Sequence, residues 1–432
     1  MQSIQAFVNR HFGLFARLGG IAVFDQMVVS GTRFLATLLI GRYCGPEELG
    51  IYSLGFSLLV LIGVLQESLV CTPFTVLRES GHKYSDREYA GSVVIHHLFM
   101  TVLSIAILLL IALYMVFWEP DAELLPVVWV LIVIAPFFLL REFARRFYFA
   151  YTEMRSALVI DLTVAVTQLL GLAALALMYK LDAQSAYMLV GICCAIAGAI
   201  WLHHCRVRLE FSTPATIELA RKHWHFGRWL VGSQAIQVFT MWSSYWLLAL
   251  FLSTRDTGIF SACMNIVLLS NPIILGLGNI LEPRLSSAYH RGGASELRRV
   301  VLKVTVLIGT AMSGFFVFMA LFGDFLVGLF YANPVYQGYQ HMISILALSF
   351  VLSSMGMTVS MALRPLQRTG IAFSLRVLDL VVMLTALVPL INAWGLTGGA
   401  YAMLCAHLVG TSARFITLRV LLAKERTRKT AP

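Results

Sequence analysis

Long apolar runs, each long enough to cross the hydrocarbon core of a lipid bilayer, dominate the chain. A helix that crosses this core needs about 20 mostly apolar residues. Such runs begin and end near 18–40, 50–72, 90–116, 124–141, 156–179, 184–203, 227–250, 257–281, 300–322, 340–363, 371–391 and 395–418. They predict an all-α polytopic membrane protein with twelve transmembrane helices. The composition agrees, because only 12% of the residues are charged, against about 25% in soluble domains.

Basic residues mark one side of the predicted membrane. The chain has 32 Lys and Arg residues, and all but five lie in the two terminal segments and in alternate loops. Arg42, Lys180 and Arg255 lie in the opposite loops, and Arg33 and Arg376 lie inside spans. The positive-inside rule therefore predicts that both termini are cytoplasmic. The net charge of +10 is explained by topology and does not indicate a nucleic-acid partner.

The chain divides into two similar halves. Residues 45–62 align without gaps to residues 253–270, and "LVIDL" at 158–162 resembles "RVLDL" at 376–380. Each half holds six spans, so the repeat is parallel and its axis lies along the membrane normal. We therefore expect two six-helix pseudo-symmetric lobes around a central cavity.

These lobes have predicted boundaries. Residues 1–203 form the N-terminal lobe, with an interfacial helix followed by spans one to six. Residues 204–226 form a cytoplasmic linker with an amphipathic helix, which Thr213 and Pro214 would begin. Residues 227–432 form the C-terminal lobe and a basic cytoplasmic tail.

The first span carries two charged residues. Asp25 and Arg33 are eight residues apart, about 12 Å along the helix axis. They share one helix face with Gln26. A charge at the centre of a span costs about 2.5–3.5 kcal/mol on insertion scales, and such residues usually mark a transport pathway. The seventh span has a similar polar stripe with Ser233 and Gln237. The stripes would line the cavity, or they would join helices by hydrogen bonds.

Other intramembrane polar groups complete the set of candidates. Arg376 and Asp379, three residues apart on the eleventh span, would form a local ion pair. For Glu67 and Asn265, an interfacial or helix-packing role is the alternative. The predicted substrate-binding residues are Arg33, Gln26, Ser233, Gln237, Asn265 and Arg376. The predicted ion-coupling residues are Asp25, Glu67 and Asp379. We interpret Arg141, Arg145 and Arg146 as topology residues first and as phosphate attractors second.

No catalytic or metal-binding motif is present. The seven cysteines form no CxxC pair, the histidine pairs have poor spacing for a metal, and neither a phosphate-binding P-loop nor an HExxH motif occurs. The loops on the side opposite the basic loops are too short for a catalytic domain. The sequence therefore predicts a protein that is not an enzyme and has no cofactor and no metal.

Two segments resemble a known group of transporters. They are "IGRYCGPEELGIYSLGFSLLVLI" at 40–62 and "LRPLQRTGIAFSLRVLDL" at 363–380. With the twelve-span, two-lobe layout, they resemble the polysaccharide-transport branch of the multidrug/oligosaccharidyl-lipid/polysaccharide (MOP) exporter superfamily, which includes O-antigen and exopolysaccharide flippases.

The resemblance implies a fold and a function. Two lobes would form a V and move an undecaprenyl-pyrophosphate-linked oligosaccharide across the bacterial inner membrane by alternating access, for lipopolysaccharide or exopolysaccharide biosynthesis. Arg33 and Arg376 would hold the pyrophosphate, and Asp25 matches by position the coupling acids of drug-exporting relatives. The implied partners are the lipid-linked substrate, membrane lipids, and a polysaccharide polymerase with its chain-length proteins.

Two alternatives remain. The first is a cation-coupled exporter of small amphipathic compounds, which an acidic cavity would favour, whereas a basic cavity would favour the flippase. The second is a membrane-embedded glycosyltransferase or polymerase, against which the short external loops argue.

Overall fold

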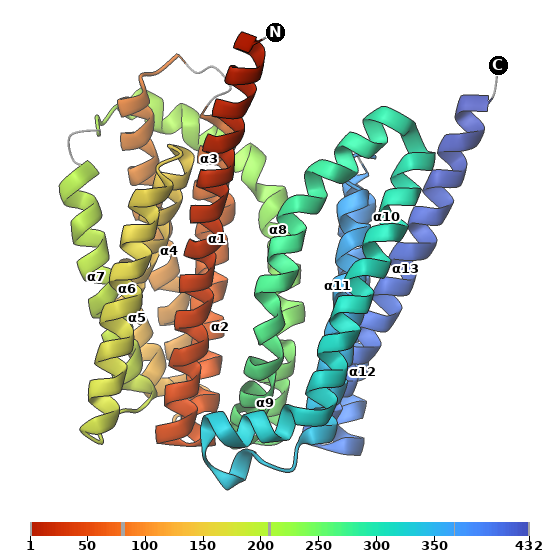
Figure 1. Ribbon diagram of the computed structural model, residues 1–432. Helices are drawn as coiled ribbons and strands as arrows, with labels where there is room; N and C mark the ends of the chain where they lie inside the picture. The colour runs from red at the N-terminus through yellow and green to blue at the C-terminus, as the bar shows by residue number, and fades with distance from the viewer. Residues whose placement is uncertain (1, 79–82, 206–208, 367, 431–432) are drawn as a thin grey trace. The chain divides into compact units, whose positions relative to one another are not determined.

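The computed structural model describes residues 2–78, 83–205, 209–366 and 368–430 of the 432-residue chain (Figure 1). Within these ranges the regular structure is entirely helical. The elements are α1 (Gln2–Cys44), α2 (Pro46–Gln66), η1 (Glu67–Cys71), α3 (Thr72–Leu77), α4 (Asp86–Trp118), α5 (Leu125–Ala150), α6 (Met154–Leu177), α7 (Ala183–Cys205), α8 (Thr213–Phe251), α9 (Thr254–Val267), η3 (Leu268–Ser270), α10 (Asn271–Tyr331), η4 (Pro334–Tyr336), α11 (Gln340–Ala362), α12 (Thr369–Trp394) and α13 (Leu396–Thr430).

Ten helices of the described chain are long and apolar enough to cross a membrane. They coincide with ten of the twelve predicted spans, which makes the chain a multi-pass membrane protein. The seventh predicted span lies on α8, and the eighth runs through α9, η3 and the start of α10. These two segments are helical but are not among the ten. The predicted interfacial segment at 1–18 continues into the first span, because α1 is one unbroken helix.

The helices form two compact units. The first comprises Met1–Tyr43 and Leu54–Ala235, and the second comprises Cys44–Ser53 and Ile236–Pro432. The boundaries of the two lobes remain a prediction. The two units show in addition how two segments pack. The linker packs with the first unit, and the first turns of α2 pack with the second.

The core of the first unit is built around α5. This helix packs against α4, α6 and α7, which bury its apolar side chains. Phe143 and Phe147 each lie edge-on to Trp201, with ring centroids 5.4 Å apart in both pairs. Phe74 of α3 stacks on Phe147 at 5.6 Å. This aromatic cluster fixes α5, and α5 in turn positions the charged side chains described below.

In the second unit, α11 packs against α10 and α13, and α12 packs against α13. The long helix α10 contains a kink at Gly293, whose φ of 63° and ψ of −153° lie outside the helical region. Only glycine adopts such backbone angles without strain. The kink falls between the predicted eighth and ninth spans, so α10 carries the end of the eighth span and the whole of the ninth.

Two segments that align in the sequence repeat contact each other inside the second unit. A Cβ atom on Gly50 would lie 1.9 Å from the carbonyl oxygen of Thr254, and one on Gly258 would lie 1.8 Å from that of Pro46. The hydroxyls of Ser53 and Ser261 are 2.6 Å apart. The contact of Gly50 with Thr254 and the contact of Gly258 with Pro46 therefore exchange repeat-equivalent residues, as in an interface with two-fold symmetry. The contact supports the predicted duplication.

Candidate functional site

The polar face of α1 carries Asp25 into the interior of the first unit. The Asp25 side chain is 2% exposed. Arg145 of α5 donates a hydrogen bond from Nη2 to Asp25 Oδ2 at 3.0 Å. The partner that an intramembrane carboxylate requires therefore comes from a residue 120 positions away in the chain.

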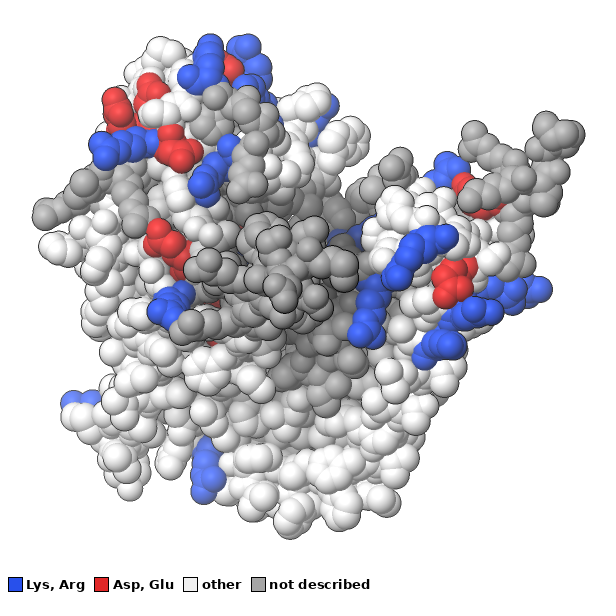
Figure 2. All heavy atoms as spheres, turned by 45° about the horizontal axis from the view of Figure 1, so that its top comes forward, with Lys and Arg blue, Asp and Glu red and all other residues white. Residues whose placement is uncertain are grey.

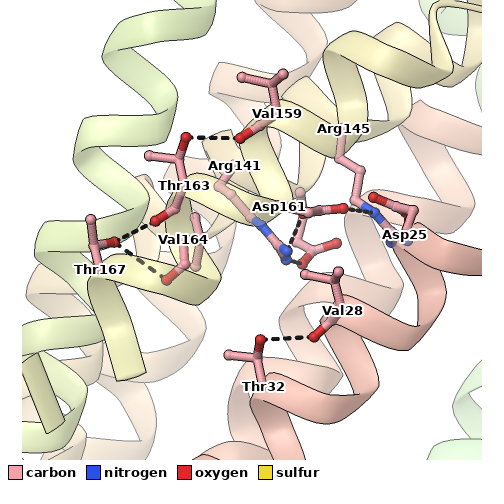
Figure 3. A network of polar contacts seen from close by, with 11 residues as sticks. Asp25, Val28, Thr32, Arg141, Arg145, Val159, Asp161, Thr163, Val164 and Thr167 are labelled. Atoms are coloured by element: carbon pink, nitrogen blue, oxygen red, sulfur yellow. Dashed lines mark hydrogen bonds and ion pairs between the residues drawn. The ribbon is translucent and has the colours of Figure 1, made fainter. Parts of the chain in front are cut away.

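A second carboxylate binds the same arginine (Figure 3). Asp161 of α6 is fully buried, and its Oδ2 lies 2.7 Å from Arg145 Nε. Arg141 donates hydrogen bonds to Asp161 and to Glu142. Because Arg141 and Arg145 are four residues apart, their guanidinium groups lie on one side of α5. The result is an ion-pair network that joins α1, α5 and α6.

These charges are costly to bury unless they neutralise each other. Removing one partner of a buried pair costs about 3–5 kcal/mol, because the other charge is left without compensation. The network is nevertheless incompletely hydrogen-bonded. Within the described residues, Asp25 Oδ1 and the Nε atoms of Arg141 and Arg145 are buried without a hydrogen-bond partner. Most buried polar atoms in proteins are hydrogen-bonded, so these atoms are exceptions to the general pattern.

Glu67 lies in a local change of helix type. It begins η1, a single π-helical turn between α2 and α3, and such turns occur often at functional sites. Arg146 Nε lies 3.0 Å from Glu67 Oε2, and Thr72 donates a hydrogen bond to Glu67 Oε1 at 3.0 Å. The three arginines of α5 are therefore all engaged with acids.

Arg33 has a different environment from Asp25, although both lie on α1. It is exposed, and its guanidinium lies over the ring of Phe56, 4.7 Å from the centroid. It also interacts electrostatically with Glu142. Gln26 is partly buried, and its amide donates to Ser30 within the same helix at 3.2 Å.

The remaining candidates are distributed over the two units. Asn265 donates a hydrogen bond to the hydroxyl of Tyr331 at 3.2 Å, which matches the helix-packing alternative. Ser233 belongs to the first unit and Gln237 to the second.

Asp379 forms its ion pair across two helices. Arg414 of α13 donates to both of its carboxylate oxygens and also to Ser360 at 3.0 Å. Arg376 is half-buried and interacts electrostatically with Arg364, Arg414 and Asp379. The aspartate therefore has a strong interhelical partner beyond the predicted neighbour on its own helix.

Sequence reasoning missed the central part of the network. Arg141 and Arg145 are buried ion-pair partners, a role that their interpretation as topology residues and phosphate attractors did not include. In the sequence, Asp161 is distinguished only as the repeat counterpart of Asp379. Two signals could have identified the group: arginines four residues apart at the end of an apolar run, and acids at equivalent positions of both repeats.

The linker is fastened to the first unit near the start of α4. Glu218 binds Lys83 at 2.8 Å and Lys222 at 3.0 Å and accepts a hydrogen bond from Tyr84. These partners lower the pKa of Glu218 to about 2. Burial lowers the pKa of His223, which contacts the hydroxyl of Tyr89, to about 3. His223 is therefore neutral at physiological pH.

Comparison with known proteins assigns the chain to a family and a fold. A family model described as polysaccharide biosynthesis protein matches residues 26–289, which is more than half of the chain. The fold is that of a multidrug resistance MATE family transporter of the MOP superfamily in an inward-facing conformation. That structure has a TM-score of 0.77 and 15% identity, and the match covers 93% of this chain and 96% of that one.

Two further solved structures share this fold. The outward-facing conformation of such a MATE family transporter has a TM-score of 0.66 and 15% identity, with 95% and 96% of the two chains covered. A MOP superfamily transporter from Pyrococcus furiosus, for which reverse polarity of the binding pocket suggests a different function, has a TM-score of 0.68 and 14% identity, with the same coverage. A comparison with curated protein sequences gives no match.

Proposed function

The chain belongs to the polysaccharide biosynthesis protein family, and from this premise we propose that it is a flippase for a lipid-linked oligosaccharide. It is a membrane transporter with the MOP superfamily fold. Its substrate would be an oligosaccharide on a polyprenyl pyrophosphate, moved across the bacterial inner membrane by alternating access and without enzymatic chemistry. A polysaccharide polymerase and chain-length proteins would then use the delivered substrate to build lipopolysaccharide or exopolysaccharide.

The observation that carries this proposal is the family match, which contains Arg33, Arg141, Arg145 and Asp161. A pyrophosphate needs cationic donors, and a guanidinium offers a planar fork that fits phosphate oxygens. Arg33 is the exposed guanidinium of the polar face of α1. We therefore propose that Arg33 contacts the pyrophosphate of the substrate.

We further propose that Asp25 couples transport to protons. A buried carboxylate is one of the few groups that can bind and release a proton inside a membrane, and such residues form proton relays in transporters. Asp25 is buried, and one of its oxygens lacks a hydrogen-bond partner among the described residues. Asp25→Asn should therefore remove the dependence of transport on the proton gradient.

The orientation proposed from the loop charges fits both units separately. In the first unit, the start of α1 lies at the same end as the starts of α4, α6 and α8 and the end of α7 (Figure 1). In the second unit, the kink of α10, the end of α11, the start of α12 and the end of α13 share one end. Figure 2 shows Lys and Arg side chains gathered at this end of each unit, and the exposed ones in the second unit include Arg291, Arg298 and Arg299. We propose that these ends are cytoplasmic.

A flipping assay tests the function. The purified protein is reconstituted into liposomes that contain a fluorescent polyprenyl-pyrophosphate oligosaccharide, and translocation is followed by loss of fluorescence to an external quencher. We expect Arg33→Ala and Arg33→Lys to abolish flipping at normal protein levels, because lysine lacks the fork. Arg155→Ala, which changes an exposed arginine of α6, is the control and should flip normally. Absence of flipping by the wild-type protein, or full flipping by Arg33→Ala, would contradict the respective proposal.

The alternative function is a cation-coupled exporter of small amphipathic compounds. The structural similarity to multidrug resistance transporters favours it. The same liposomes separate the two functions when a cationic dye replaces the lipid-linked sugar. Proton-driven dye efflux without oligosaccharide flipping would establish the exporter.

A further inference from the structure

The first turns of α8 lie across the first turns of α4 (Figure 1). Thr216 of α8 donates a hydrogen bond to the hydroxyl of Ser92 at 3.2 Å, and its carbonyl oxygen lies 2.9 Å from His96 Nε2. Two turns later on α8, His223 contacts the hydroxyl of Tyr89 at 3.0 Å. The start of α8 therefore packs against the first three turns of α4.

This part of α4 reaches beyond the hydrocarbon core of the membrane. The helix has 33 residues and is about 50 Å long, whereas the core is about 30 Å thick. The last turn of α4 ends in Phe117 and Trp118, which are exposed, as is typical of the boundary between lipid and water. Its first turn instead carries Asp86 and Glu88. The extra length therefore lies at the start of α4, which places the start of α8 at the level of the lipid head groups.

The start of α8 presents a mixed apolar and basic face away from α4. Its buried positions recur at every fourth residue from Ala215 to Gly227, so one side of the helix is covered by the first unit. The opposite side is the outward stripe, which consists of Ile217, Arg221, Trp224 and Arg228. All four side chains are exposed, to 59% for both Ile217 and Trp224. Basic residues that alternate with a tryptophan and an aliphatic residue are typical of a helix that lies in a membrane surface.

The positive charges of the outward stripe are not neutralised within the described chain. Glu218 is the one acid between residues 213 and 229, and two lysines bind it at 2.8 Å and 3.0 Å. Neither Arg221 nor Arg228 forms an ion pair with a described residue. Arg228 lies over the ring of Trp229, 5.6 Å from its centroid, which leaves its charge in place. Two guanidiniums therefore remain available for an anion.

We propose that the outward stripe binds anionic phospholipids of the surrounding membrane. The guanidiniums of Arg221 and Arg228 bind lipid phosphates through charge-assisted hydrogen bonds, and Ile217 and Trp224 enter the boundary between head groups and acyl chains. A zwitterionic head group carries its own ammonium, which competes for the phosphate, so an anionic lipid such as phosphatidylglycerol is preferred. The proposal depends on the membrane location of the chain and not on the substrate that it transports.

Helix α8 belongs to both units, because the division between them falls between Ala235 and Ile236. It is assigned as one helix from Thr213 to Phe251. Lipid bound to the outward stripe therefore anchors the start of an element that continues from the first unit into the second.

The test measures which lipid contacts Trp224. The full chain is reconstituted into liposomes of phosphatidylcholine and phosphatidylglycerol, in which one of the two lipids carries brominated acyl chains that quench tryptophan fluorescence on contact. Trp224→Phe, measured in parallel, isolates the signal of Trp224 from that of the other tryptophans. We expect brominated phosphatidylglycerol to quench this signal at a lower mole fraction than brominated phosphatidylcholine. Each arginine should contribute about fivefold to the preference, which corresponds to about 1 kcal/mol for a basic residue near an anionic surface.

The two arginines are tested by substitution. Arg221→Gln and Arg228→Gln should each lower the preference for phosphatidylglycerol about fivefold, and the double glutamine variant should show almost none. The double variant Arg221→Lys/Arg228→Lys keeps both charges and should keep most of the preference, which separates loss of charge from loss of fold. Arg291→Gln removes an exposed arginine of the second unit and should match the wild type. High salt should reduce the preference, because it screens exposed charges.

Four results would overturn the inference. The first two are equal quenching of Trp224 by the two brominated lipids and an unchanged preference in the double glutamine variant. Quenching of Trp224 by aqueous acrylamide and by neither brominated lipid would place the outward stripe in water or against another protein. Relief of the phosphatidylglycerol quenching by a small fraction of polyprenyl-pyrophosphate oligosaccharide would assign the stripe to the transported substrate. None of these measurements requires transport, so a failure of the proposed function leaves them intact.

Discussion

The glycine contact between the two repeats provides a sharp test of the packing in the second unit. In Gly258→Ala, the new Cβ atom would lie 1.8 Å from the carbonyl oxygen of Pro46. That oxygen belongs to the backbone, so it cannot rotate away, and the two helices must separate by about 1.6 Å to reach an ordinary contact distance of 3.4 Å. Overpacking of this kind costs about 1–3 kcal/mol, and the backbone clash places Gly258 at the upper end.

The matched control is Gly314→Ala in α10. No atom lies within 4 Å of the Cβ position at Gly314, so this variant receives only the helix-propensity gain of about 1 kcal/mol that alanine has over glycine. Gly258→Ala has the same helix-propensity gain, which offsets part of the overpacking cost of about 3 kcal/mol. The net loss of stability is therefore about 2 kcal/mol. For a unit of this size, that loss lowers the melting temperature by about 4–8 °C.

Thermal unfolding of the purified protein in detergent, followed by intrinsic tryptophan fluorescence, measures the effect. We expect Gly258→Ala and Gly50→Ala each to melt several degrees below the wild type, and Gly314→Ala to melt at or above it. The double variant Gly50→Ala/Gly258→Ala should lose less than the sum of the single losses, because the first substitution already separates the helices. A melting temperature of Gly258→Ala equal to that of Gly314→Ala would refute the close contact.

Three further predictions concern the network, the linker and the topology. Asp161→Asn should destabilise the protein by about 3–5 kcal/mol, because it leaves buried guanidiniums uncompensated; a thermal shift below 2 °C would contradict this. Because burial lowers the pKa of His223 to about 3, the unfolded state binds the proton first, and stability should fall as the pH drops from about 6.5 toward 3. His223→Gln should flatten this decline in melting temperature. A periplasm-dependent phosphatase fused after Pro432 should be inactive, and activity would place the C-terminus outside the cytoplasm.

The helical secondary structure and its lipid surroundings follow from local properties of the sequence. Apolar runs and helix periodicity are local properties, and they were enough to predict the all-helical membrane fold and the parallel duplication. The same periodicity singled out Asp25, because a carboxylate inside an apolar run is anomalous wherever the helix packs. The gapless alignment also places Gly50 opposite Gly258, but it does not indicate that the two residues meet.

The pairing of the charges, in contrast, depends on how the helices pack. Asp25 pairs with Arg145 across 120 residues, and Asp161 joins them from a third helix. Asp379, its repeat counterpart, takes a partner from α13, so equivalent acids have different surroundings. A guanidinium at the end of a span looks the same in sequence whether it faces cytoplasmic water or turns inward to an acid. Helix packing selects between these states, because a buried charge is tolerated only where another helix supplies its counter-charge.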